Sequence, residues 1–131
     1  KTSSPATGAE QMDRAGKGRL GELEAAKFLE KNGYKVLERN FRCRYGEIDL
    51  VAKDGQTIVF VEVKTRGSER FGGPTESVDA RKQKKILLTS QFYIESNRLV
   101  DADLRFDVVG VEIREGALSF ELVKNAFEAA E

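Results

Sequence analysis

The first strong pattern along the chain is that of an amphipathic helix near the N-terminus. Between Gly16 and Asn32, Ala, Leu and Phe are mixed with Glu and Lys, and Gly33 supplies a C-terminal stop. The residues three, four and seven positions after Glu22 are Ala, Ala and Leu. This spacing places Glu22 on the inward face of the helix, so a carboxylate begins a buried stripe.

After Gly33 the hydrophobic period changes to that of strands, with one further helical stretch. Five segments have strand character: residues 34–41, 47–52, 57–64, 104–113 and 117–123. A Gly-rich loop at residues 66–76 precedes the second helix, which Thr75 or Ser77 would cap and which ends near Asn97. The order α-β-β-β-α-β-β predicts an α/β fold with a mixed central sheet of about five strands flanked by helices.

Acidic residues alternate along the second predicted strand. Period-two alternation places Glu47, Asp49 and Val51 on one face and residues 48, 50 and 52 on the other. One face of this strand is therefore expected to carry two carboxylates.

The third predicted strand carries Glu62 and Lys64 on one face, although apolar residues occupy both of its faces. Such a strand is typical of the centre of a sheet, where an unpaired charge is costly. A hairpin turn at residues 54–55 would set Asp49 diagonal to Glu62, and a turn at residues 55–56 would set the two directly opposite. Either register places Asp49, Glu62 and Lys64 on one face, whereas a one-residue slip would separate them.

The composition describes a single globular domain and limits its chemistry. The 131 residues are 40% hydrophobic and 34% charged, and we expect a flexible tail at 1–12, one domain at 13–124 and an acidic tail at 125–131. No apolar run is long enough for a membrane span, and the single Cys43 fits a reducing compartment, which predicts a cytoplasmic protein. The chain has no histidine, so a catalyst would have to use carboxylates, Lys, Arg or Tyr.

Glu22, Asp49 and Glu62 together predict a site for Mg²⁺ or Mn²⁺, since hard cations prefer oxygen ligands and need no histidine. Asp49 and Glu62 would be direct ligands, with the backbone carbonyl of Val63 as another, and Glu22 would act directly or through water. Lys64 would orient a nucleophilic water or neutralise a phosphate oxygen. The simpler interpretation is that Glu62 and Lys64 form an ordinary ion pair.

Basic residues surround this candidate site in the sequence. Net charge is zero, but the segment from residue 112 onward carries −3, which leaves +3 on the rest. Gln83 lies on the packed face of the second helix, where it would position water or substrate or make a structural hydrogen bond. The predicted nucleic-acid-binding residues are Arg42, Arg44, Arg66, Arg70, Arg81, Lys82, Gln83, Lys84 and Lys85. A charge run on a helix is also typical of a solvated face.

Three other features have both a functional and a structural interpretation. The loop at residues 66–76 would close over DNA as a lid, or would simply connect strand and helix. Arg105 and Asp107 share a strand face and would form a structural ion pair or assist the site. Phe41 and Tyr45 lie among arginines and would extend a nucleic-acid track or pack at the rim of the core.

The sequence also resembles a known group, through GRLGELEAAKFLEKNGYKVLERNFR, GEIDLVAKDG, FVEVKTR, the FGGP loop and RFDVV. These segments, in this order, are similar to the YraN-type family of bacterial proteins, which is placed in the PD-(D/E)XK nuclease superfamily beside archaeal Holliday-junction resolvases. The resemblance implies a restriction-endonuclease-like core, with Glu22 as the helix acid, Asp49 as the central acid, and Glu62 and Lys64 as the E-x-K pair.

The function implied is a Mg²⁺- or Mn²⁺-dependent endonuclease that cleaves DNA, with selectivity for branched or junction structures, in repair, recombination or DNA uptake. Junction cleavage would favour a homodimer with two sites. Two alternatives remain open: a non-catalytic nucleic-acid-binding module, and an interaction subunit that binds repair or recombination proteins.

Overall fold

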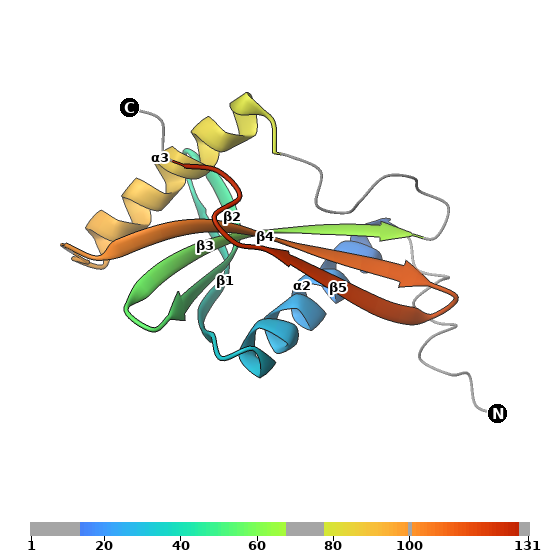
Figure 1. Cartoon of the computed structure of the whole chain (residues 1–131). Coiled ribbons are helices and arrows are strands. Elements are labelled where there is room, and N and C mark those ends of the chain that lie inside the picture. The colour runs from blue at the N-terminus through green and yellow to red at the C-terminus, as the bar shows by residue number, and fades with distance from the viewer. Residues whose placement is uncertain (1–13, 68–77, 100, 129–131) are drawn as a thin grey trace.

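The computed structural model describes residues 14–67, 78–99 and 101–128 (Figure 1). The elements are α2 (Arg14–Lys31), β1 (Lys35–Cys43), β2 (Gly46–Asp54), β3 (Thr57–Gly67), α3 (Ala80–Ser96), β4 (Asp103–Arg114) and β5 (Ala117–Val123). This order confirms the predicted α-β-β-β-α-β-β arrangement. The predicted tail at residues 1–12 and residues 68–76 of the predicted lid lie outside the described residues.

The five strands form one mixed sheet in the order β1-β2-β3-β4-β5. Neighbouring strands are antiparallel except β3 and β4, which are parallel. The parallel pair requires a crossover connection, and α3 lies in that connection. As the middle strand of five, β3 is the predicted central strand.

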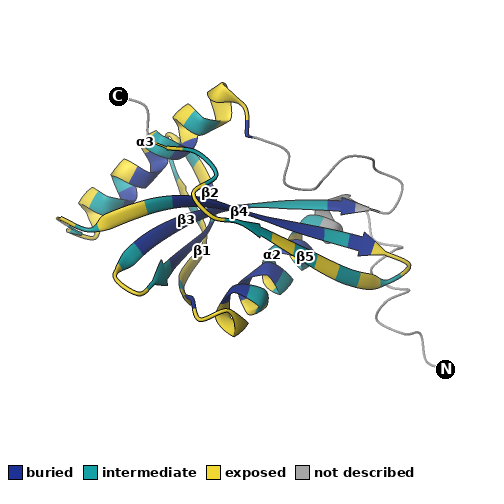
Figure 2. Cartoon of the chain, viewed as in Figure 1, coloured by how far each residue is buried: buried dark blue, intermediate teal, exposed yellow. Residues whose placement is uncertain are grey.

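The two helices cover opposite faces of the sheet (Figures 1 and 2). One cluster of sheet residues, which includes Leu50, Val59 and Val109, packs against α2. The residues packed with α3 include Phe60 and Phe106. Val59 and Val61 of β3 lie in one core, and Ile58 and Phe60 lie in the other, as the doubly apolar pattern of this strand predicts.

Helix α2 ends where the sequence predicts because of a Schellman motif. Gly33 has a φ of 91°, its N–H bonds the carbonyl of Glu30 at 3.2 Å, and the N–H of Tyr34 bonds the carbonyl of Leu29 at 3.0 Å. Tyr34 and Leu29 both lie in the core cluster on the α2 side. This ending directs the chain into β1.

One glycine lets α2 approach the sheet closely beside Glu22. A Cβ at Gly21 would overlap with Oγ1 of Thr65 on β3 and would lie 3.1 Å from the Cβ of that residue. A larger residue at position 21 would therefore clash with β3. The glycine brings the adjacent Glu22 close to the sheet.

The start of α3 differs from the prediction. Asp79 is the N-cap, and its side chain accepts a hydrogen bond from the N–H of Lys82 at 2.8 Å. Capping by Thr75 or Ser77 is therefore wrong; Asp is as good a capping residue, and it lies closer to the apolar run. As a result, the basic residues Arg81, Lys82, Lys84 and Lys85 occupy the first turns of the helix.

The end of the described chain packs on the sheet. The N–H of Ala126 bonds the carbonyl of Phe106 at 2.7 Å, and the Phe127 ring stacks on that of Phe106 with centroids 4.9 Å apart. The first residues of the predicted acidic tail thus contact the domain. In the described part of the chain, neither helix has the length and hydropathy to cross a membrane.

Candidate metal centre and nucleic-acid interface

Strands β2 and β3 separate midway along their length and form a fork. Their pairing runs from Asp54↔Thr57 to Leu50↔Val61. Beyond that point, β2 continues beside β1 and β3 continues beside β4. The register places the turn at residues 55–56, which is the second of the two predicted hairpins.

The fork changes the alternation of β2, and one predicted face assignment is wrong. Ile48 packs with Val51 in the cluster against α3, whereas Leu50 lies in the cluster against α2. Asn40, on β1 between the partners of Ile48 and Leu50, has a φ of 55°. The strand therefore twists at Asp49, which moves Ile48 to the opposite face from Leu50.

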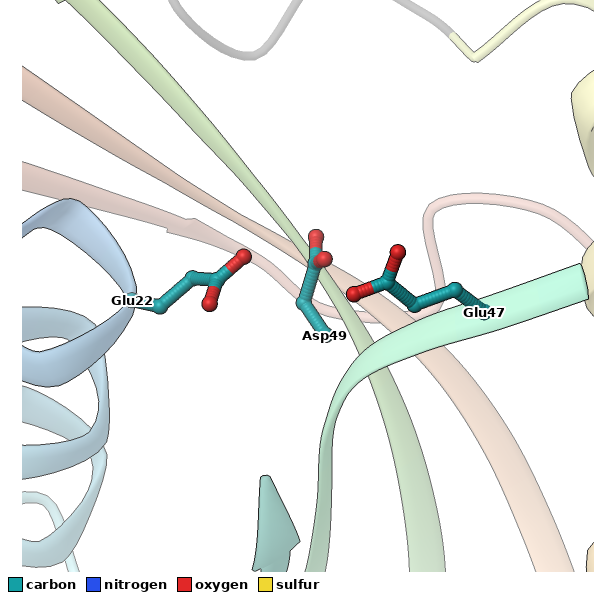
Figure 3. A group of neighbouring side chains, drawn as sticks. All are labelled: Glu22, Glu47 and Asp49. Carbon is teal, nitrogen blue, oxygen red and sulfur yellow. The ribbon is translucent and has the colours of Figure 1, made fainter. Parts of the chain in front are cut away.

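Three carboxylates converge in this fork (Figure 3). Glu22 reaches from α2 on one side, Glu47 reaches from β2 on the other, and Asp49 lies between them. One oxygen of each lies within 4.8 Å of the others. The inward position predicted for Glu22 is consistent with this arrangement. Glu47 was not among the predicted ligands, although its alternation with Asp49 was the signal that could have identified it.

Asp49 has the most strongly perturbed environment of the three. Its Oδ2 accepts the backbone N–H of Val63 at 2.8 Å, across the gap between the strands. Burial raises the pKa of Asp49 to about 8, with further increases from the charges of Glu62, Glu22 and Glu47, while the Val63 N–H lowers it. Burial and the neighbouring carboxylates therefore favour the protonated form of Asp49 at neutral pH.

Glu62 lies beside this cluster but is paired with a cation from α3. Its side chain is only 8% exposed, and its Oε2 lies 2.8 Å from Nζ of Lys82. The hydrogen bond to Glu62 raises the pKa of Lys82. Glu62, which is predicted to be a direct metal ligand, is thus paired here with Lys82, which is predicted to contact nucleic acid, and not with Lys64 as the simpler interpretation has it.

The remaining predicted site residues on β3 lie along the fork. The N–H and C=O of one strand residue point to the same side of the strand, so the carbonyl of Val63 faces the fork together with its N–H. Lys64 is half-buried, on the same face as Glu62 by alternation. Arg66 is 8% exposed, which differs from the open position expected for a phosphate contact.

The other predicted nucleic-acid-binding residues fall into two groups. Arg81, Lys84 and Lys85 are exposed on α3, whereas Nε2 of Gln83 donates a structural hydrogen bond to the carbonyl of Val78 at 2.7 Å. On the β1–β2 hairpin, Nε of Arg42 lies 3.4 Å from Oε2 of Glu47, and Arg44 lies over the ring of Tyr45. Arg70 lies outside the described residues.

The Arg105 and Asp107 pair belongs to a structural network at the opposite end of β2 from the fork. Nε of Arg105 lies 2.9 Å from Oδ1 of Asp107, and Nη2 lies 2.9 Å from Oδ2 of Asp54. The Tyr34 hydroxyl and the Asn125 N–H also donate to Asp107, each at 2.9 Å. Asp107 is fully buried, so these bonds explain how a charge is tolerated there. The predicted structural ion pair is confirmed.

The donor set in the fork suits a hard divalent cation. Carboxylate oxygens from two elements lie close together, and burial together with the neighbouring carboxylates raises the pKa of Asp49. Mg²⁺ and Mn²⁺ take such oxygen ligands and retain waters for the remaining positions. Glu22, Glu47 and Asp49 are therefore the residues that would hold the ion.

Comparison with known proteins identifies the family. The profile described as "Uncharacterised protein family UPF0102" matches residues 21–111. A UPF0102 protein of Syntrophus aciditrophicus is 50% identical over 113 residues, which cover 86% of this chain and 89% of the relative. A UPF0102 protein of Caldicellulosiruptor saccharolyticus is 43% identical over 118 residues, which cover 88% and 100%. The solved structure of Pyrococcus furiosus SfsA in complex with Ca²⁺ is similar with a TM-score of 0.46 and 15% identity, over 86% of this chain and 65% of that one. Both the profile and the identities show that the chain belongs to the UPF0102 family, the YraN-type group that its sequence motifs predict.

Proposed function

We propose that this protein is a Mg²⁺- or Mn²⁺-dependent endonuclease that hydrolyses phosphodiester bonds in branched or junction DNA. The observation that carries the proposal is the convergence of Glu22, Glu47 and Asp49 in the fork between β2 and β3. Two of these acids and the adjacent Glu62 and Lys64 match the pattern implied by the resemblance to PD-(D/E)XK nucleases. The preference for junctions rests on that resemblance alone.

Each residue of the fork has a distinct role in this proposal. A bound divalent cation would supply an activated water and neutralise charge on the phosphate. Glu22, Glu47 and Asp49 hold the cation, and the N–H of Val63 fixes the orientation of Asp49. Lys64, two residues beyond Glu62, orients the nucleophilic water or contacts a phosphate oxygen. Lys82 keeps the buried carboxylate of Glu62 paired.

The basic start of α3 supports binding of a polyanion. Arg81 and Lys82 occupy the first turn, where the helix dipole disfavours cations, and the first turn contains no acidic residue. Helix stability therefore does not explain these residues. A phosphate backbone would interact favourably with these cations, while the Asp79 carboxylate already accepts the N–H of Lys82 at the helix N-terminus. The exposed Lys84 and Lys85 extend the same surface.

Cleavage of labelled DNA under a divalent titration tests the proposal. The wild-type chain should cut a four-way junction or a forked duplex in Mg²⁺ or Mn²⁺, and chelation should stop it. Asp49→Asn should reduce the rate by about 10²-fold or more because the amide removes a ligand charge while keeping the shape. Glu95→Gln is the matched control, since Glu95 is an exposed acid on α3. Equal cleavage by the wild type and Asp49→Asn would refute the metal-site assignment.

A non-catalytic nucleic-acid-binding module is the second candidate, and the Glu62–Lys82 pair favours it. The Lys82 ammonium satisfies the acid of the E-x-K motif within the fold, without any metal ion. A module of this kind would bind DNA in chelator, show no Mn²⁺ binding by calorimetry and cut no substrate. An interaction subunit for repair or recombination proteins would show neither metal binding nor DNA binding.

A further inference from the structure

The tip of the β1–β2 hairpin carries an exposed aromatic ring that the proposed metal site does not use. Tyr45 lies between the two strands and is 37% exposed. The Arg44 guanidinium carbon lies 5.1 Å from the ring centroid, and Nη2 donates a hydrogen bond to the Tyr45 hydroxyl at 3.1 Å. Phe92 of α3 meets the ring at 6.3 Å and an angle of 63°. The ring is thus held in position in a residue that is more than a third exposed.

The same hairpin tip is fixed close to the carboxylate cluster. Tyr45 precedes Glu47 by two residues, a backbone distance of about 7 Å in extended chain. A Cβ at Gly46 would lie 3.2 Å from Oγ1 of Thr89 and 3.7 Å from Cβ of Lys85, so the tip packs tightly on α3. The distance to Glu47 corresponds to about two steps of a stacked DNA strand.

The chemistry of this tip matches that of single-strand recognition. Proteins bind unpaired nucleotides by stacking bases on aromatic rings beside cations that follow the backbone, without reading sequence. Tyr45 provides the ring and Arg44 provides a cation against it, while Arg42 on the same hairpin and Lys85 on α3 are further exposed cations. A base inside an intact duplex is already stacked on both sides and cannot use such a ring.

We propose that Tyr45 and Arg44 form a base-stacking platform that selects DNA with unpaired or splayed nucleotides next to the cleavage site. This inference rests on the proposed endonuclease function, because it places the stacked base close to the phosphate held at the carboxylate cluster. It gives the preference for branched DNA a physical basis in this chain. Branch points and forks expose such bases, whereas a blunt duplex exposes them only at its ends.

A fluorescence experiment tests the platform independently of cleavage. The chain has no tryptophan, so Tyr45→Trp creates a single reporter at the tip. In an Asp49→Asn background with chelator, a forked duplex should quench this tryptophan by stacking, and a long blunt duplex should quench it much less. Leu104→Trp is the control, because Leu104 is 45% exposed and lies at the β4 end that pairs with Ile58, away from the fork.

Affinity measurements complete the test. Tyr45→Ala should weaken binding to the forked DNA by about 5- to 100-fold, the range expected for one stacked base, and should change duplex binding less than about twofold. Tyr45→Phe should retain most of the affinity for the forked DNA, since stacking does not need the hydroxyl.

Equal losses of affinity for both DNAs, or binding of the forked DNA without quenching of the tryptophan, would overturn the platform. Quenching of the Tyr45→Trp reporter and selectivity for forked DNA, together with a wild-type chain that never cleaves, would overturn the nuclease function but leave the platform standing. Absence of all DNA binding would overturn both.

Discussion

Replacing Asp49 by Asn should stabilise the fold while removing its metal chemistry. Asn keeps the shape of the side chain and an oxygen that can accept the Val63 N–H, but it carries no charge. The pKa of Asp49 in the folded chain, about 8, exceeds the ordinary value of 3.8. The folded state therefore holds the Asp49 proton more tightly than the unfolded state does. Wild-type stability that is present at acid pH is lost as the pH rises from about 4 to 8.

The size of the effect follows from the pKa difference. Between the ordinary Asp pKa of 3.8 and pH 7, each pH unit corresponds to about 1.4 kcal/mol. The total is about 4 kcal/mol of unfolding free energy. Ionisation lets the fork relax, and Asn makes a weaker bond to the Val63 N–H than a carboxylate does. We therefore expect Asp49→Asn to be more stable than the wild type by about 1–3 kcal/mol at pH 7.

Urea denaturation in chelator at a series of pH values measures this difference. The stability gain of Asp49→Asn should grow from pH 5 to pH 8 and then level off. Added Mn²⁺ should stabilise the wild type and leave the variant unchanged, and the affinity of the wild type for Mn²⁺ should increase with pH up to about 8. Asp103→Asn, at an exposed strand end, should show no pH-dependent gain. A gain that does not vary with pH, or a variant less stable than the wild type at pH 8, would refute the reasoning.

Three other changes test individual parts of the fork. Glu47→Gln should weaken Mn²⁺ binding by about 10-fold or more in calorimetry, because it removes one of the converging charges; unchanged binding would exclude Glu47 as a ligand. Lys82→Ala should destabilise the fold by about 1–3 kcal/mol, measured by urea denaturation, because it leaves Glu62 buried and unpaired. Adding Glu62→Gln to this variant should recover most of the lost stability. Gly21→Ala should lower the free energy of unfolding by about 1–3 kcal/mol through its clash with Thr65, and adding Thr65→Ala should restore it. A Gly21→Ala variant as stable as the wild type would contradict the close approach of α2.

The sequence alone determined the elements and their order. Helix α2 and its end follow from the apolar spacing and from Gly33, and the central place of β3 follows from apolar residues on both faces. These features depend on local chemistry, which the chain encodes within a few residues. The cap of α3 was the local exception, because Asp79 competes with earlier residues of similar capping strength.

The candidate site was determined only in part by the sequence. The inward position of Glu22 and the proximity of Asp49 to Glu62 could be predicted from periodicity and register. Whether Glu47 joins Asp49 depends on where β2 leaves β3, and the partner of Glu62 depends on how α3 crosses the sheet. Side-chain alternation assigns residues to faces of a strand, but it does not state where pairing ends or which helix residue lies opposite. Those are long-range contacts, and only the packing of both helices on the twisted sheet decides them.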